Sequence, residues 1–158
     1  MSKRLLNLNE GEGIRTAVDV VITDPEQKKV LLGLRKAETG TGTWSFIGGH
    51  QKTGEQIHET ALREITEEVG DDCNVKLTDE VVGVRENKIP PWYVPHITVI
   101  IKGIYEGGEI RNNRPDENSE VNWFDFNDLP ENLFSGVGEV LQNFRQRKSR
   151  VVTDWPEN

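Results

Sequence analysis

Apolar residues along the chain fall into short runs that predict a fold of strands and helices. Several stretches are rich in β-branched residues and are bounded by Gly, Pro, Asn or Asp, which is typical of strands. Strands are predicted over 14–23, 30–35, 44–47, 74–88, 93–105 and 120–126. The turn Asp24-Pro25-Glu26-Gln27 predicts that the first two form a hairpin. The run 96–101 (HITVII) is almost continuously apolar, as in a central strand buried on both faces.

The segment 49–70 (GHQKTGEQIHETALREITEEVG) has the pattern of an amphipathic helix. Thr53 followed three residues later by Gln56 reads as a capping box, which predicts that the helix begins near Gly54 or Glu55. Good helix formers continue without a proline to residue 70, where a glycine stop belongs. At about 100° per residue, one apolar stripe is predicted. It is formed by Ile57, Ala61, Leu62, Ile65 and Val69.

A second amphipathic helix is predicted over 134–148. Its inward face is formed by Val137, Val140, Leu141 and Phe144. Strands on both sides of one long helix, closed by a C-terminal helix, predict an α/β fold with a mixed β-sheet sandwiched between helices. The 158 residues contain no visible linker or repeat, so we expect one domain, 1–158, with an N-terminal arm at 1–13 and a polar tail at 149–158.

Three glutamates on the first predicted helix form a candidate metal site. Glu64, Glu67 and Glu68 are spaced i, i+3 and i+4, so their carboxylates converge. Glu64 and Glu68 lie at the edge of the apolar stripe, where packing would half-bury them. Crowded, partly desolvated carboxylates need a cation, yet Arg63 is the single base against seven acids within 55–72. Oxygen ligands favour Mg2+ or Mn2+; a solvated acidic face is the alternative.

The glutamates belong to a longer pattern. Gly49 is followed after five residues by Glu55, and after seven more by the run 63–70 (REITEEVG). This pattern resembles the signature box of the Nudix hydrolases, which cleave nucleoside diphosphates linked to another group. The resemblance implies an α/β/α sandwich and a divalent cation on the three glutamates, with Glu64 and Glu67 also in catalysis. Arg63 lies close enough to Glu55 for an ion pair that orients the acidic cluster.

The residues around the box complete the expected metal site and also depart from the family pattern. In the family a backbone carbonyl just before the box joins the metal shell, and the resemblance implies Gly48 for this position. Ile47 stands where relatives usually have proline, and Asp71 where they have an aliphatic residue. Lys52 brings a positive charge where many relatives carry glutamate, which leaves the number of metal ions open.

Two segments outside the box are candidates for substrate binding. The run 33–44, GLRK followed by GTGTW, resembles the segment before the box in the nucleoside-triphosphate diphosphatases. There Arg35 offers a planar fork to a phosphate, with Lys36 beside it; a flexible loop with two solvated bases is the alternative. Trp92 and Tyr93 follow two prolines and either stack on a nucleobase or close a loop over the core.

The acidic segment 116–120 (DENSE) is a candidate source of a further carboxylate. Nudix enzymes often take a metal ligand or a general base from a loop outside the box. Glu120, at the mouth of a predicted strand, is the first choice for this role, and Glu117 is the second. A solvated acidic turn is the alternative interpretation.

Charge and cysteine content exclude several classes of function. The net charge of -8 argues against nonspecific binding of nucleic acid or of an anionic membrane. Cys73 is the only cysteine, so no intrachain disulfide can form, which agrees with a cytoplasmic location. No segment reads as a signal peptide or a membrane span.

Together these features predict a Mg2+-dependent pyrophosphohydrolase that converts a nucleoside triphosphate into the monophosphate and pyrophosphate. A hydrolase of ADP-ribose or of nucleoside-diphosphate sugars is the alternative, and a non-catalytic Nudix-fold nucleotide-binding module is the second. The expected partner is a small-molecule nucleotide. The resemblance also implies a homodimer.

Overall fold

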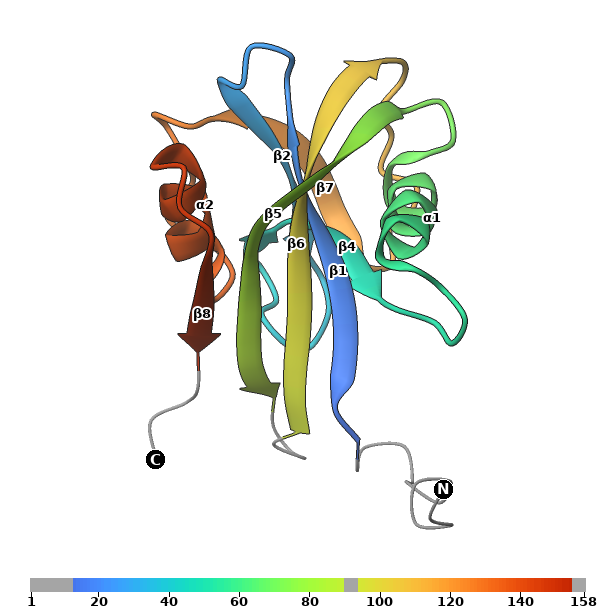
Figure 1. Cartoon of the computed structure of the whole chain (residues 1–158). Coiled ribbons are helices and arrows are strands. Elements are labelled where there is room, and N and C mark those ends of the chain that lie inside the picture. The colour runs from blue at the N-terminus through green and yellow to red at the C-terminus, as the bar shows by residue number, and fades with distance from the viewer. Residues whose placement is uncertain (1–12, 90–93, 155–158) are drawn as a thin grey trace.

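The computed structural model describes residues 13–89 and 94–154, which form one eight-stranded mixed sheet and two helices (Figure 1). The strands are β1 (Arg15–Thr23), β2 (Lys29–Arg35), β3 (Trp44–Ser45), β4 (Ile47–His50), β5 (Asn74–Ile89), β6 (Val94–Gly107), β7 (Asn118–Asp125) and β8 (Arg150–Asp154). The helices are α1 (Ile57–Val69) and α2 (Val137–Arg145). Nearly every predicted element is present, with the predicted strand 44–47 divided at Phe46 into β3 and β4.

The sheet is mixed, as predicted. Its order is β3-β2-β1-β6-β5-β8, with β4 beside β1 and β7 beside β2. The β1–β6 and β5–β8 pairs are parallel, and the other pairs are antiparallel, including the predicted pairing of β1 with β2. β6 is a central strand between β1 and β5, and its consecutive residues Ile100 and Ile101 are both buried, one in each core. The prediction of a strand buried on both faces is therefore confirmed.

The two helices cover opposite faces of the sheet, so the predicted α/β/α sandwich is confirmed (Figure 1). Alternating residues of β1 divide between the two cores because successive strand side chains point to opposite faces. Val20 packs in the core beneath α1, whereas Val21 packs in the core beneath α2. The α1 core includes Ala61, Ile65 and Val69, and the α2 core includes Val137, Val140 and Leu141.

α1 begins later than the capping pattern predicted. The residue that caps it is Gln56, whose backbone N–H donates to the Glu59 carboxylate at 2.7 Å, as in a capping box. Thr53 instead lies in the turn that precedes the helix. The reason is Gly54, whose φ of 88° is left-handed and therefore incompatible with a helix starting there. The capping box predicted from Thr53 and Gln56 is thus wrong by one turn.

The buried face of α1 also differs from the predicted stripe. Ile57, the first residue of the helix, is 37% exposed, and Leu62, at the outer edge of the buried arc, is 51% exposed. The buried positions are Thr60, Ala61, Glu64, Ile65, Glu68 and Val69. Two carboxylates therefore lie within the packed face, deeper than the half-burial that the sequence predicted. The helix ends where predicted, at Gly70.

The predicted polar tail contains a strand. β8 pairs in parallel with β5, Val152 lying opposite Arg85, and Val152 is buried in the α2 core. The prediction of a tail over 149–158 is therefore wrong for 150–154. Its apolar content was too short to suggest a strand, and its partner lies far away in the sequence. The predicted N-terminal arm falls almost entirely outside the described residues.

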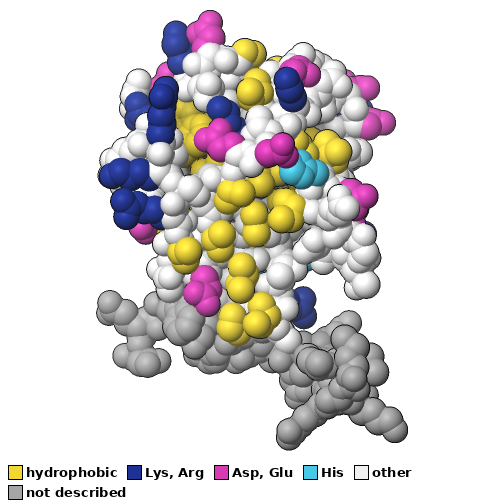
Figure 2. Space-filling view, in the orientation of Figure 1, with side chains coloured by type: hydrophobic (Ala, Val, Ile, Leu, Met, Phe, Trp, Pro, Cys, Tyr) yellow, Lys and Arg dark blue, Asp and Glu magenta, His cyan; other side chains and the backbone are white. Residues whose placement is uncertain are grey.

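The surface leaves some apolar side chains uncovered. Figure 2 shows them running down the middle of one face, over the strands that lie between the two helices. Among the described residues, no helix is long and apolar enough to cross a membrane.

Candidate active site

The site lies where β4 passes between β1 and the carboxylates of α1. Gly48 pairs with Asp19, and Gly49 pairs with Val18. A Cβ on Gly48 would stand 2.3 Å from the Val18 carbonyl oxygen, and one on Gly49 would stand 2.5 Å from the Glu64 carboxyl group. Glycine is therefore required at Gly48, where a Cβ would meet the backbone of β1, and at Gly49 it leaves room for the Glu64 carboxyl group.

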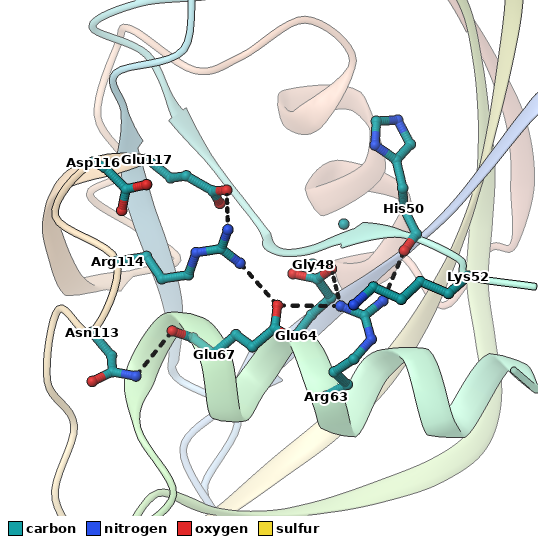
Figure 3. A pocket seen from close by; sticks show the side chains of 11 residues that line it. Gly48, His50, Lys52, Arg63, Glu64, Glu67, Asn113, Arg114, Asp116 and Glu117 are labelled. Atoms are coloured by element: carbon teal, nitrogen blue, oxygen red, sulfur yellow. Dashed lines mark hydrogen bonds and ion pairs between the residues drawn. The ribbon is translucent and has the colours of Figure 1, made fainter. Parts of the chain in front are cut away.

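Arg63 holds the acidic side of the site together (Figure 3). Its guanidinium contacts Glu55 at 2.5 Å, Glu64 at 2.7 Å and Glu67 at 3.2 Å. It also donates to the His50 carbonyl at 2.8 Å. The predicted ion pair with Glu55 is confirmed, and hydrogen bonding from Arg63 lowers the pKa of Glu55 to about 2. Arg63 thus joins the loop before α1, β4 and the carboxylates in one network.

Glu68 is the deepest carboxylate of the site. Its side chain is buried and accepts hydrogen bonds from the Gly48 N–H at 3.4 Å and the Asn118 amide at 3.3 Å. Burial, followed by the negative charges of Glu64 and Asp19, raises the pKa of Glu68 well above its ordinary value. Burial also raises the pKa of Glu64, against the opposing effect of Arg63. Burial thus disfavours the negative charge of both acids, and a cation bound beside them would stabilise it.

Arg114 closes the opposite wall, and sequence reasoning missed it. Its guanidinium contacts Glu67 at 2.8 Å and Glu117 at 2.5 Å. Arg114 lies in the segment between β6 and β7, and no local pattern links it to Glu67, which is 47 residues away. The cleft between these walls has a volume of about 680 Å³. It is lined by Gly48, Gly49, His50, Lys52, Arg63, Glu64, Glu67, Asn113, Arg114, Asp116 and Glu117.

The structure brings Glu117, not Glu120, to this cleft. Glu120 lies on β7 opposite Leu34, is exposed, and accepts a bond from Asn122 at 3.5 Å. Glu117 precedes the strand and lines the cleft. The second choice from the acidic segment is therefore the carboxylate that faces the box glutamates, because β7 begins at residue 118 and carries Glu120 onward.

A second cavity of about 310 Å³ adjoins the cleft and shares Gly48, Gly49, His50 and Glu117 with it. Its other polar and aromatic lining includes Asp19, Arg35, Phe46, Arg85, Asn87, Thr98 and Phe134. Asp19 and Arg85 form a buried ion pair at 3.1 Å. Asn87 Oδ1 and Arg85 Nε are buried without a hydrogen-bond partner. Both atoms can therefore form a hydrogen bond with a ligand or a water molecule in this cavity.

The remaining predicted binding residues have different positions. Arg35 lines the second cavity, where its guanidinium lies 4.3 Å from the Phe134 ring centroid. Lys36 lines neither cavity; its Nζ donates to the Pro115 carbonyl at 2.9 Å and so anchors the turn that carries Glu117. Trp92 and Tyr93 lie outside the described residues, so their stacking role stays a prediction.

The donor set suits a hard divalent cation in chemistry, although it is not assembled around one. In the part of the chain that the structure describes, no three His, Cys, Asp or Glu side chains converge as a ready metal site. The guanidinium groups of Arg63 and Arg114 occupy the carboxylate oxygens instead. The available ligands are nevertheless oxygens, and buried Glu68 would gain most from a cation, so the residues fit Mg2+ or Mn2+.

Known proteins resemble this chain over most of its length. An oxidized purine nucleoside triphosphate hydrolase from Danio rerio is 31% identical over 104 residues, covering 65% of this chain and 62% of that protein. An ADP-ribose pyrophosphatase from Methanocaldococcus jannaschii is 34% identical over 135 residues, covering 84% of this chain and 74% of that protein. The chain thus spans less than two thirds of the zebrafish relative.

Solved structures share the fold. The crystal structure of a MutT NUDIX hydrolase from Burkholderia pseudomallei matches with a TM-score of 0.71 and 23% identity, covering 84% of this chain and 98% of that one. Residues 13–144 match the NUDIX domain family, a range that contains all of α1 and every residue of the cleft. The chain therefore belongs to the NUDIX family.

Proposed function

We propose that this Nudix hydrolase is a Mg2+-dependent pyrophosphohydrolase that cleaves a (deoxy)nucleoside triphosphate into the monophosphate and pyrophosphate. The observation that carries the proposal is the continuity of the carboxylate cleft with the second cavity through Gly48, Gly49, His50 and Glu117. A polyphosphate in the cleft and a nucleoside in the second cavity would then belong to one molecule.

The chemistry assigned to the cleft is the attack of water on a phosphorus atom of the triphosphate. The water oxygen forms a bond to the α- or the β-phosphorus, the P–O bond of the bridge between these two atoms breaks, and pyrophosphate or the nucleoside monophosphate, respectively, departs with the bonding electron pair. A carboxylate accepts the proton from the water, and Glu117, Glu64 and Glu67 are the candidates that line the cleft. Arg63 positions Glu64 and Glu67 for these roles.

Glu64, Glu67 and Glu68, with the Gly48 carbonyl, would hold the cation. Nudix hydrolases generally use divalent metal ions, and Mg2+ is the proposed ion, with Mn2+ as the alternative. When bound, the cation supplies neutralisation of the phosphate oxygens and a lower pKa for water. Buried Glu68 would bring a fixed negative charge to that position, because the Gly48 N–H and the Asn118 amide already orient its carboxylate.

Two features support a triphosphate as the substrate. The second cavity, at about 310 Å³, lies at the small end of ligand pockets and suits one nucleoside rather than two. Arg35 lies at its border and can offer a guanidinium to a phosphate, although its Nε already donates to the Thr39 carbonyl at 3.0 Å. The zebrafish relative, named for triphosphate hydrolysis, agrees with this assignment.

A hydrolase of ADP-ribose or a nucleoside-diphosphate sugar is the second candidate. The specific observation in its favour is the longer match to the archaeal ADP-ribose pyrophosphatase, which covers 84% of this chain. The same carboxylates would serve either substrate, because both contain a pyrophosphate linkage. A non-catalytic binding module is less well supported, since the acidic network of Arg63 is fully formed.

Product analysis on a panel of compounds separates these candidates. The panel contains the common and oxidised nucleoside triphosphates, ADP-ribose and nucleotide sugars, each with and without Mg2+. Monophosphate plus pyrophosphate from a triphosphate would support the first candidate and name the base. Cleavage of ADP-ribose or a sugar nucleotide alone would replace it with the second. The homodimer, the cytoplasmic location and the single-domain organisation remain predictions.

A further inference from the structure

We propose that Arg114 is an exchangeable counter-ion of the cleft: it neutralises Glu67 and Glu117 in the metal-free protein, yields them to the entering cation, and then binds a phosphate of the nucleotide. The proposal rests on the proposed function for the identity of the ligands. It assigns Arg114, which lies outside the signature box, a place in the reaction.

The geometry places Arg114 in direct competition with a cation. One guanidinium nitrogen lies 2.8 Å from Glu67 Oε2 and the other lies 2.5 Å from Glu117 Oε1, so the side chain bridges carboxylates on opposite walls (Figure 3). These two acids belong to the set that suits a hard cation. A divalent ion bound to these two acids would lie beside the positive guanidinium, so like-charge repulsion sets the two cations in competition.

Arg63 also touches Glu67 but is poorly suited to exchange. It contacts three carboxylates and the His50 carbonyl, and its side chain is 20% exposed. Within the described residues, the Arg114 guanidinium forms ion pairs with Glu67 and Glu117 alone, and its side chain is 31% exposed. Moving the Arg63 guanidinium would break its interactions with four partners. Moving the Arg114 guanidinium would break two half-exposed ion pairs. Half-exposed ion pairs are weak, so Arg114 is the cation that can leave.

The side chain can swing without moving its loop. The backbone beside it is bound to the end of α1: the Arg111 N–H donates to the Val69 carbonyl at 3.0 Å and the Asn113 N–H donates to the Glu68 carbonyl at 2.9 Å. The Glu117 N–H closes the turn on the Arg114 carbonyl at 2.9 Å. The backbone therefore fixes the position of the Arg114 Cα, and rotation about the side-chain torsions can still move the guanidinium.

A released guanidinium would remain over the cleft that receives the polyphosphate. Its planar fork matches a phosphate group and pairs with it bidentately. The turn that carries Arg114 is held by Lys36, through its Nζ bond to the Pro115 carbonyl, so the released group stays near the cleft. The positive charge of Arg114 would thus neutralise the carboxylates before the cation binds and a phosphate of the substrate afterwards.

The test measures Mn2+ binding without nucleotide, by the loss of the free-ion electron paramagnetic resonance signal. The proteins are wild type, Arg114→Gln, Arg114→Lys and the control Arg111→Gln, which removes a nearby loop arginine paired with Asp71 and Asp72 away from the cleft. We expect Arg114→Gln to bind Mn2+ about tenfold more tightly than wild type. Arg111→Gln should bind Mn2+ with the affinity of wild type. Arg114→Lys should also bind Mn2+ with an affinity close to that of wild type, because lysine keeps the positive charge.

The phosphate-binding step is tested by steady-state kinetics at saturating Mg2+. Both Arg114 variants should raise KM for the triphosphate more than they lower kcat, since Lys lacks the fork. Mn2+ affinity that is equal or weaker in Arg114→Gln would overturn the counter-ion role. Tighter Mn2+ binding with an unchanged KM would overturn the phosphate role alone. A wild type that hydrolyses nothing yet shows the Mn2+ difference would refute the proposed function and leave the counter-ion standing.

Discussion

Arg63 Nε lies 2.5 Å from Glu55 Oε1, which ties the loop before α1 to the second turn of the helix. Arg63 reaches both Glu64 and Glu67 with Nη1, so the pair with Glu55 sets the direction from which those carboxylates are held. The site therefore depends on Glu55, which does not itself line the cleft.

Glu55→Gln should lower kcat by about 10- to 100-fold, because groups that orient metal ligands typically have effects of this size. The measurement is initial-rate kinetics at saturating Mg2+. The protein should stay folded, since Glu55 lies in a turn and the core beneath α1 is unaffected. A variant with wild-type kcat would show that the pair has no orienting role.

The same pair predicts a pH dependence of stability. Arg63 lowers the pKa of Glu55 to about 2, so the ionised carboxylate stabilises the fold above the ordinary glutamate pKa of 4.5. This contribution should be lost as the pH falls from 4.5 towards 2. The gap in the free energy of unfolding between wild type and Glu55→Gln, measured with urea, should accordingly narrow from pH 7 to pH 3. A gap that widens on acidification would contradict the assignment.

Glu68→Gln should reduce metal-dependent turnover by at least about 1,000-fold while leaving the fold intact. The amide can still accept from the Gly48 N–H, and burial already disfavours the charge of Glu68. Thermal unfolding without metal should show a stability within about 1 kcal/mol of wild type. Retained turnover with Mg2+ would remove Glu68 from the metal site.

Gly49→Ala should affect activity more than stability. The added Cβ meets the end of the Glu64 side chain, which can move away and thereby leave its position in the cleft. We expect a stability loss of about 1–3 kcal/mol together with a severe loss of turnover. Gly138→Ala is the matched control, because its Cβ meets only Leu133 at an ordinary 3.5 Å within α2. The control should gain about 0.5 kcal/mol and keep full activity.

Much of this fold follows from local pattern. β1, β2 and β6 were predictable because their apolar runs are long and their partners bury both faces. The helical wheel identified α1 but misplaced its buried face, which is rotated from the predicted apolar stripe towards Glu64 and Glu68 and leaves Leu62 exposed. β8 was not predictable, because its pairing with β5 joins segments distant in the chain.

The site likewise contains residues that the sequence could predict and residues that it could not. The carboxylates of Glu64, Glu67 and Glu68 were predictable because one helix carries them all. Arg114 was not, because its contact with Glu67 depends on how the segment before β7 folds back over the end of α1. Glu120 was preferred over Glu117 for its place beside a strand, whereas the strand itself carries Glu120 away from the cleft.

Glu117, which precedes β7, and Glu120, which lies on it, allow a direct test of which acid serves the site. Glu117→Gln should lower kcat by roughly 100-fold or more, because it removes a candidate base or metal ligand. Glu120→Gln should change kcat by less than about twofold, since surface substitutions away from special contacts have small effects. Equal losses in both, measured at one pH and saturating Mg2+, would return Glu120 to the site.

The proposed function requires that this carboxylate cleft hydrolyse a pyrophosphate linkage with a divalent cation. The decisive measurement is pyrophosphate release from the preferred triphosphate in EDTA and after titration with Mg2+ or Mn2+. We expect no release in EDTA, full activity once the cation saturates, and no recovery for Glu68→Gln. Turnover that continues undiminished in EDTA would contradict the proposed function.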